Sequence, residues 1–91
     1  GSFLTKKVDQ FTNNKVQLRK GDILYLFSDG YADQFGGAKS RKLMYKRFRE
    51  LLISISYLPM AEQRNQLDDF LNDWMGDEEQ VDDIIVMGVK V

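Results

Sequence analysis

The chain has 91 residues, 13 of them basic and 14 acidic, which is enough for one domain with a modest core and gives a formal net charge of −1. This balance gives no preference for nucleic acid or an anionic membrane, and no apolar run approaches the ~20 residues of a membrane span. Cysteine and histidine are absent, which excludes disulfides, Cys/His zinc sites and Ser-His-Asp triads. Any catalysis must therefore use carboxylates, which favour hard cations such as Mg²⁺ or Mn²⁺.

The N-terminal third of the chain predicts strands. Gly1 and Ser2 are typical of a tag remnant, so we treat residues 3–91 as a single domain and, with no signal peptide visible, expect it in the cytoplasm. Two asparagines, at 13 and 14, favour a turn, and polar and apolar residues alternate after them. We therefore expect a hairpin from about Val8 to Leu18.

A continuous apolar segment, Ile23 to Phe27, follows that region. Five apolar residues in a row predict a strand covered on both faces. The pairs Gly21-Asp22 before it and Asp29-Gly30 after it are turn signals. The strand therefore ends on a carboxylate at a glycine-containing corner. The residues that follow, to about Ser40, contain a glycine pair and predict a loop.

Two helices are predicted next. Apolar residues recur at helical spacing from Leu43 onward, Pro59 ends this first helix and opens the second, and Gly76 is a natural stop. Basic residues between 42 and 49 lie on the first of these helices beside its apolar stripe, and a solvated helix face is favoured over a nucleic-acid surface. Trp74 lies on the second apolar stripe and is expected in the core rather than in a ligand site.

The last element predicted is a strand over residues 84–91, after an acidic loop over residues 77–80. Strands first, two helices and a final strand give an α+β fold, an antiparallel sheet with two helices packed on one face. If the two apolar strands are antiparallel neighbours, Asp29 at the end of one meets Asp82 and Asp83 at the start of the other. Such carboxylates must raise a pKa or bind a cation. An Asp-Gly turn and a solvated strand start explain the same residues equally well.

In their order and spacing, residues 28–33 (SDGYAD) and residues 81–86 (VDDIIV), with two helices between them, resemble the C-terminal part of a metal-dependent serine/threonine protein phosphatase of the PPM, or type-2C, family. The SpoIIE-like branch, which dephosphorylates phosphoserine on anti-sigma-factor antagonists, is the most similar. The resemblance implies a partial PPM sandwich with Asp29 and Asp82 as catalytic metal ligands. Asp83 is the third metal-site candidate, in a supporting role, and Gly30 supplies the turn. Mn²⁺ or Mg²⁺ would activate the attacking water.

The chain also departs from that family. The family domain is more than twice as long, its first metal-binding acids lie in an N-terminal half that is missing here, and Arg19 and Arg64 do not match its phosphate-binding arginine. We therefore expect a fragment that is inactive in isolation, with an uncovered sheet surface that favours homo-oligomers. A non-catalytic interaction or dimerisation module is the alternative. A receiver-like phosphoacceptor is disfavoured, because that fold alternates parallel strands with helices.

Overall fold

The computed structural model describes residues 3–7 and 19–91 of the chain. The predicted hairpin from about Val8 to Leu18 lies outside these residues. In chain order the described elements are β1 (Phe3–Lys7), β2 (Ile23–Phe27), α1 (Gly30–Asp33), β3 (Phe35–Gly36), β4 (Arg41–Lys42), α2 (Tyr45–Ile55), α3 (Met60–Met75) and β5 (Val86–Lys90). Within the described ranges, no helix is long and apolar enough to cross a membrane.

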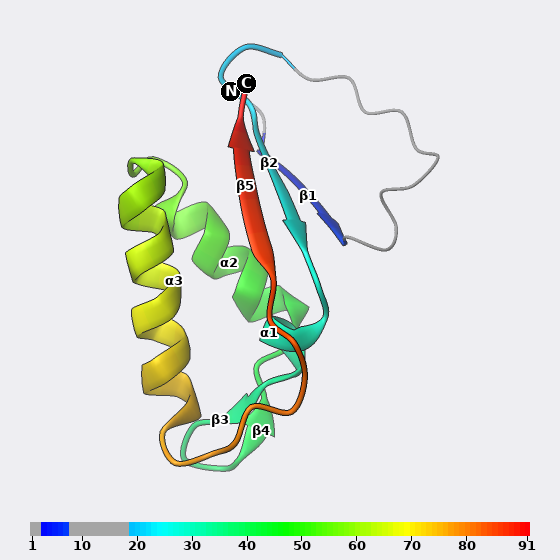
Figure 1. Cartoon of the computed structure of the whole chain (residues 1–91), viewed down its shortest axis with the longest axis vertical. Helices are drawn as coiled ribbons and strands as arrows, with labels where there is room; N and C mark the ends of the chain where they lie inside the picture. The colour runs from blue at the N-terminus through cyan, green and yellow to red at the C-terminus, as the bar shows by residue number, and fades with distance from the viewer. Residues whose placement is uncertain (1–2, 8–18) are drawn as a thin grey trace.

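A three-stranded sheet with the order β1-β2-β5 forms one layer (Figure 1). Strands β2 and β5 are antiparallel, with Ile23 opposite Lys90 and Phe27 opposite Val86. The antiparallel pairing predicted for the two apolar strands is therefore confirmed. Strand β1 runs parallel to β2, so the sheet is mixed and not antiparallel throughout. A parallel neighbour needs a long connection, and the segment over residues 8–22 is long enough to supply it.

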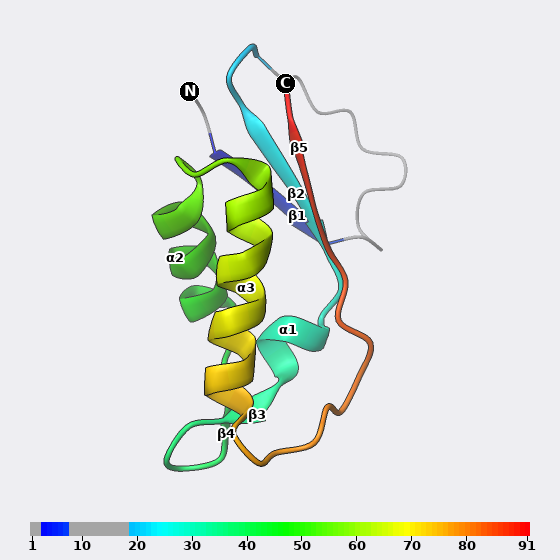
Figure 2. The same cartoon turned by 60° about the vertical axis from the view of Figure 1, so that its left-hand side comes forward.

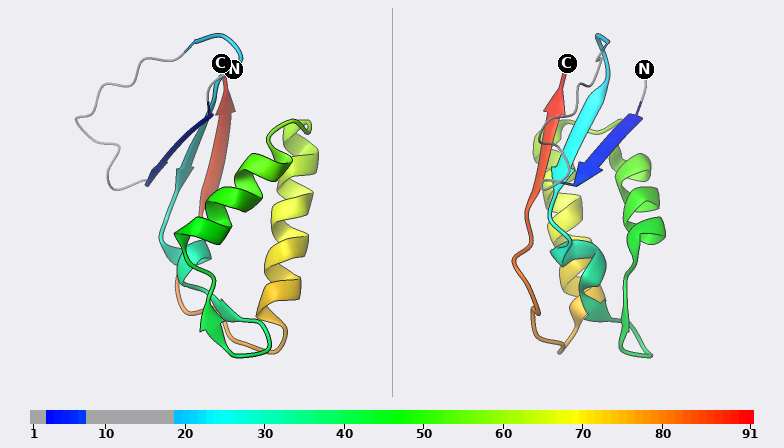
Figure 3. Two further views of the ribbon diagram at one scale, coloured as in Figure 1. Left: turned by 180° about the vertical axis from the view of Figure 1, so that it is seen from behind. Right: turned by 90° about the vertical axis from the view of Figure 1, so that its right-hand side faces the viewer.

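The two long helices, α2 and α3, lie on the same face of this sheet (Figures 2 and 3). Ile23, Tyr25 and Phe27 belong to the core cluster together with Phe48 and Leu52 of α2. The Tyr25 hydroxyl also donates a hydrogen bond to Gln63 of α3. The α+β class with helices on one face is therefore confirmed. The helices pack on this face because side chains alternate along β2, so that its odd-numbered residues lie on the same face of the sheet.

The opposite face of the sheet is apolar and partly open. Ile85, Met87 and Val89 alternate with the residues that face the helices, and their exposed fractions are 48%, 50% and 48%. Both long helices lie on the other side of the sheet (Figure 3). The surface formed by these three residues is called the outer face below.

Several boundaries differ from the predictions. The stretch expected as a loop after Gly30 contains the four-residue α1 and the short antiparallel pair β3 and β4. Strand β5 begins at Val86, two residues after the predicted start. The Ile85 N–H is bonded by the Ser28 side chain, at 3.0 Å, and not by a backbone carbonyl. The Ser28 N–H donates to the Ile85 carbonyl at 3.0 Å, so one backbone bond and one side-chain bond join the two segments here. Both helices begin and end close to their predicted limits.

Candidate active site

The corner after β2 packs directly against the segment that leads into β5. Ser28 Oγ donates to the Asp83 carbonyl at 2.9 Å and accepts from the Ile85 N–H at 3.0 Å. A Cβ atom added to Gly30 would lie 2.1 Å from the Asp83 carbonyl oxygen. Only glycine permits this approach of two backbones. The structure therefore places the Asp29-Gly30 corner beside Asp83, as the antiparallel arrangement predicts.

Asp29 lies at this corner in a half-buried, hydrogen-bonded environment. It is the residue before α1, and its carbonyl accepts a bond from the Asp33 N–H at 2.9 Å. Its carboxylate oxygen Oδ1 accepts a hydrogen bond from the hydroxyl of Tyr45, the first residue of α2. A bond of this kind, from a neutral hydroxyl to an ionised carboxylate, is stronger than a neutral pair. Asp29 is therefore held by the helix layer as well as by its own turn.

Asp82 and Asp83 lie on an exposed segment between α3 and β5. Asp82 Oδ1 accepts a bond from the Asp83 N–H at 2.8 Å, and Gln80 donates to the Asp82 carbonyl at 2.9 Å. Carboxylate oxygens at this place suit Mg²⁺ or Mn²⁺. Among the described residues, however, no three acidic side chains come together as a metal-binding group. The chemistry of these donors fits a hard cation, and the described residues do not by themselves form a complete ligand set.

A buried glutamine, Gln34, links the segment after α1 to the acidic loop over residues 77–80. The sequence did not predict this contact. Gln34 is fully buried, and its Nε2 donates to the Glu79 carbonyl at 2.8 Å. The backbone carbonyl of Gln34 accepts a hydrogen bond from Trp74 Nε1 at 2.9 Å. Trp74 also packs against the core cluster, as predicted from its helical stripe. The signal in the sequence is weak, because Gln34 finds its partner 45 residues away.

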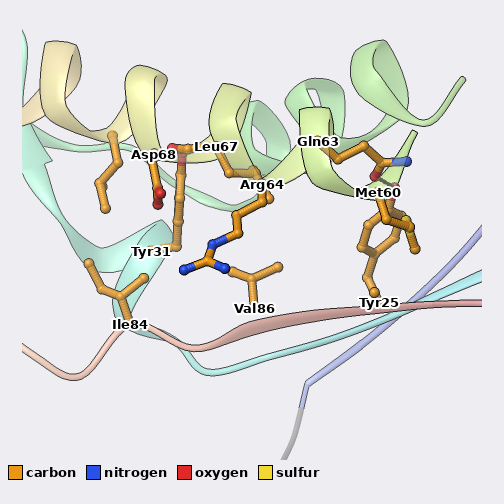
Figure 4. A pocket seen from close by; sticks show the side chains of 11 residues that line it. Tyr25, Tyr31, Met60, Gln63, Arg64, Leu67, Asp68, Ile84 and Val86 are labelled. Carbon is orange, nitrogen blue, oxygen red and sulfur yellow. Dashed lines mark hydrogen bonds between the residues drawn. The ribbon is translucent and has the colours of Figure 1, made fainter. Parts of the chain in front are cut away.

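A cavity of about 340 Å³ lies between α3 and β5, at a different place (Figure 4). Tyr25, Leu67 and Val86 are among its apolar lining residues, and the Arg64 guanidinium points into it. The Tyr31 hydroxyl donates to the Leu67 carbonyl at 2.7 Å beside it. Burial, with a smaller contribution from the Asp68 charge, raises the pKa of Tyr31. Neither Asp29 nor Asp82 lines this cavity.

The comparisons with known proteins agree with this arrangement. The family model for Stage II sporulation protein E (SpoIIE) matches residues 4–91, and the chain belongs to this family. Its fold is similar to the SiaA-PP2C domain of Pseudomonas aeruginosa, with a TM-score of 0.72 and 30% sequence identity. The match covers 74% of this chain and 27% of that chain. No curated protein matches the chain significantly. The chain is thus a member of the SpoIIE family whose fold corresponds to part of a PP2C domain.

Proposed function

We propose that this chain supplies part of the active site of a metal-dependent protein serine/threonine phosphatase. Asp29 and Asp82 are the metal-binding carboxylates, Asp83 supports them, and Gly30 permits their two segments to meet. The observation that carries this proposal is the contact of Ser28 and Gly30 with the Asp83 backbone. If Asp29 were only a turn residue, its corner would need no close contact with a segment more than 50 residues away in the sequence.

The chemistry is hydrolysis of a phosphate monoester. A bound Mn²⁺ or Mg²⁺ supplies a water nucleophile and neutralises phosphoryl charge. Asp29 and Asp82 would hold the cation through carboxylate oxygens, and the contact of Gly30 with the Asp83 backbone fixes the separation of the two segments that carry them. The chain contains no histidine or cysteine and therefore offers neither a phosphohistidine nor a phosphocysteine intermediate.

The substrate that we propose is phosphoserine on a cytoplasmic signalling protein of the anti-sigma-factor antagonist type. Membership in the SpoIIE family supports this substrate class. The chain spans 27% of the length of the SiaA-PP2C chain that it matches, so the remaining ligands and the phosphate-binding group belong to other parts of the domain. We therefore expect no turnover of p-nitrophenyl phosphate by residues 1–91 alone with Mn²⁺. Robust turnover would contradict this expectation.

Paramagnetic broadening by Mn²⁺ tests the metal site without requiring activity. In the ¹⁵N-labelled chain, the amide signals of Asp29, Gly30 and Asp83 should broaden before all others. The substitutions Asp29→Asn and Asp82→Asn should each weaken this effect by at least tenfold in Mn²⁺ concentration, because each removes an anionic ligand. Asp69→Asn, at an exposed position of α3, is the matched control. Equal broadening in all four proteins would refute the proposed site.

A second candidate function, a non-catalytic interaction or dimerisation module, is favoured by the outer face. Ile85, Met87 and Val89 are each about half exposed, and contiguous apolar surface of this kind commonly marks an interface. This candidate requires no cation at Asp29, so the Mn²⁺ titration separates the two. It also predicts a homo-oligomer, which light scattering at high protein concentration detects.

A further inference from the structure

An apolar aromatic residue such as phenylalanine could fill the position of Tyr45, but it would lack the hydroxyl group. Tyr45 is the first residue of α2, and its ring lies 6.1 Å from the ring of Phe27, at an interplanar angle of 44°. Phe27 is the last residue of β2, two positions before Asp29. The ring contact therefore brings the Tyr45 hydroxyl to the corner, where it donates to Asp29 Oδ1.

The backbone holds Tyr45 at this position. The Met44 N–H donates to the Ala32 carbonyl at 2.8 Å, and the Leu43 N–H donates to the Gln34 carbonyl at 3.1 Å. Both bonds fasten the start of α2 to the segment that follows Asp29. Met44 has a φ of 76°, which is unfavourable for a residue with a side chain.

The unusual conformation of Met44 is not explained by burial of its own side chain, which is 59% exposed. The backbone strain serves to turn the chain so that α2 begins against the corner. Strained residues that are held by their surroundings commonly cluster at functional sites. This turn places the hydroxyl of Tyr45 at the corner.

From this geometry we infer that Tyr45 is a positioning residue for the carboxylate of Asp29, orienting it to bind a divalent cation. The inference rests on the proposed function, because Asp29 is a metal ligand only there. A hydrogen bond to a ligating carboxylate fixes its rotation and so reduces the ordering required when the cation binds. Phenylalanine would preserve the contact with Phe27 and the apolar packing, and would lose only this orientation.

Tyr45→Phe is the direct test, with the Mn²⁺ titration of the labelled chain as the readout. Loss of an orienting partner commonly costs about 10- to 100-fold in metal affinity, and we expect a loss in that range at the Asp29 amide. Tyr57→Phe is the matched control, because Tyr57 is 81% exposed. Its Mn²⁺ affinity should equal that of the unmodified chain. Asp29→Asn, for which a loss of at least tenfold is expected, shows the effect of removing the ligand itself.

A measurement without metal keeps the inference testable if Tyr45→Phe does not fold. Replacing the Tyr45 hydroxyl proton by deuterium should shift the carboxyl ¹³C resonance of Asp29 in the unmodified chain. Absence of this isotope shift would overturn the inference. Equal Mn²⁺ affinities for Tyr45→Phe and the unmodified chain, with Asp29→Asn impaired, would overturn the inference and leave the proposed function standing. If Mn²⁺ has no effect on the Asp29 amide signal of the unmodified chain, both the inference and the proposed function are refuted.

Discussion

The substitution Gly30→Ala probes the junction on which the candidate site depends. Its new methyl group would lie 2.1 Å from the Asp83 carbonyl oxygen and 2.8 Å from the carbonyl carbon. The Asp83 backbone would have to retreat by at least about 1.3 Å to reach an ordinary contact of 3.4 Å, and overpacking of this kind costs about 1–3 kcal/mol. The same movement stretches the two Ser28 hydrogen bonds, each of which contributes about 1 kcal/mol.

Together these effects predict a loss of about 3 kcal/mol in the free energy of unfolding. A two-state domain of 91 residues has about 5–14 kcal/mol in total, so the loss is a large fraction of its stability. With a urea m-value of about 1–3 kcal/mol/M, the unfolding midpoint should fall by about 1–3 M. Fluorescence of Trp74 reports the transition, and the Asp83 and Ile84 amide signals should shift.

Gly88→Ala is the matched control for this experiment. Its methyl group would meet the flexible end of Met60 at 2.9 Å and the ring of Tyr25 at 3.4 Å. Met60 can move aside, and alanine is favoured over glycine in a strand by about 0.5–1 kcal/mol, so we expect little net change in stability. A Gly30→Ala protein as stable as Gly88→Ala, with unshifted Asp83 signals, would refute the close junction.

Three further predictions concern other parts of the chain. Trp74→Phe should cost about 1 kcal/mol in urea unfolding, because it removes the indole hydrogen bond to the Gln34 backbone carbonyl, which keeps only the Leu43 N–H as a donor. If the chain self-associates through the outer face, Met87→Glu should abolish the oligomer in light scattering without loss of helical circular dichroism; persistent oligomers would exclude that face. Because folding raises the pKa of Tyr31 above its ordinary value of 10.0, its hydroxyl stabilises the fold up to about pH 10, and that stability declines at higher pH. Tyr31→Phe should reduce this alkaline decline in thermal unfolding, and an identical pH profile would argue against it.

The sequence predicts those elements whose signal is local. Strand β2 is five apolar residues between turn signals, and α2 and α3 carry apolar residues at helical spacing. Their pairing and layer follow from the chain order and from the need to cover an apolar face. The four-residue α1 has too few residues to show a period. The parallel position of β1 depends on contacts distant in sequence, which a local pattern does not record.

The candidate site shows the same difference between local signals, which the sequence records, and contacts that are distant in sequence. The strand ends predict that Asp29, Asp82 and Asp83 gather at one rim of the sheet, and the structure brings the backbones of Gly30 and Asp83 into contact. Their metal-binding roles remain a prediction. The residues that fix the cluster were not predicted, because each is a polar residue whose partner is distant. Tyr45 and Gln34 are the main examples, with partners 16 and 45 residues away.

The two sides of the candidate site are held unequally, and this determines how it would assemble. Asp29 is half-buried and fixed through Tyr45, whereas Asp82 is exposed and its hydrogen bonds join it to Gln80 and Asp83, close to it in sequence. A cation that needs both carboxylates must therefore order the Asp82 side at a cost in conformational entropy. That segment leads directly into Ile85 of the outer face, where apolar side chains stand half exposed. Covering the outer face would stiffen the start of β5 and so lower that cost. Metal affinity should thus rise when the outer face is occupied, and the cation should in turn strengthen whatever covers it.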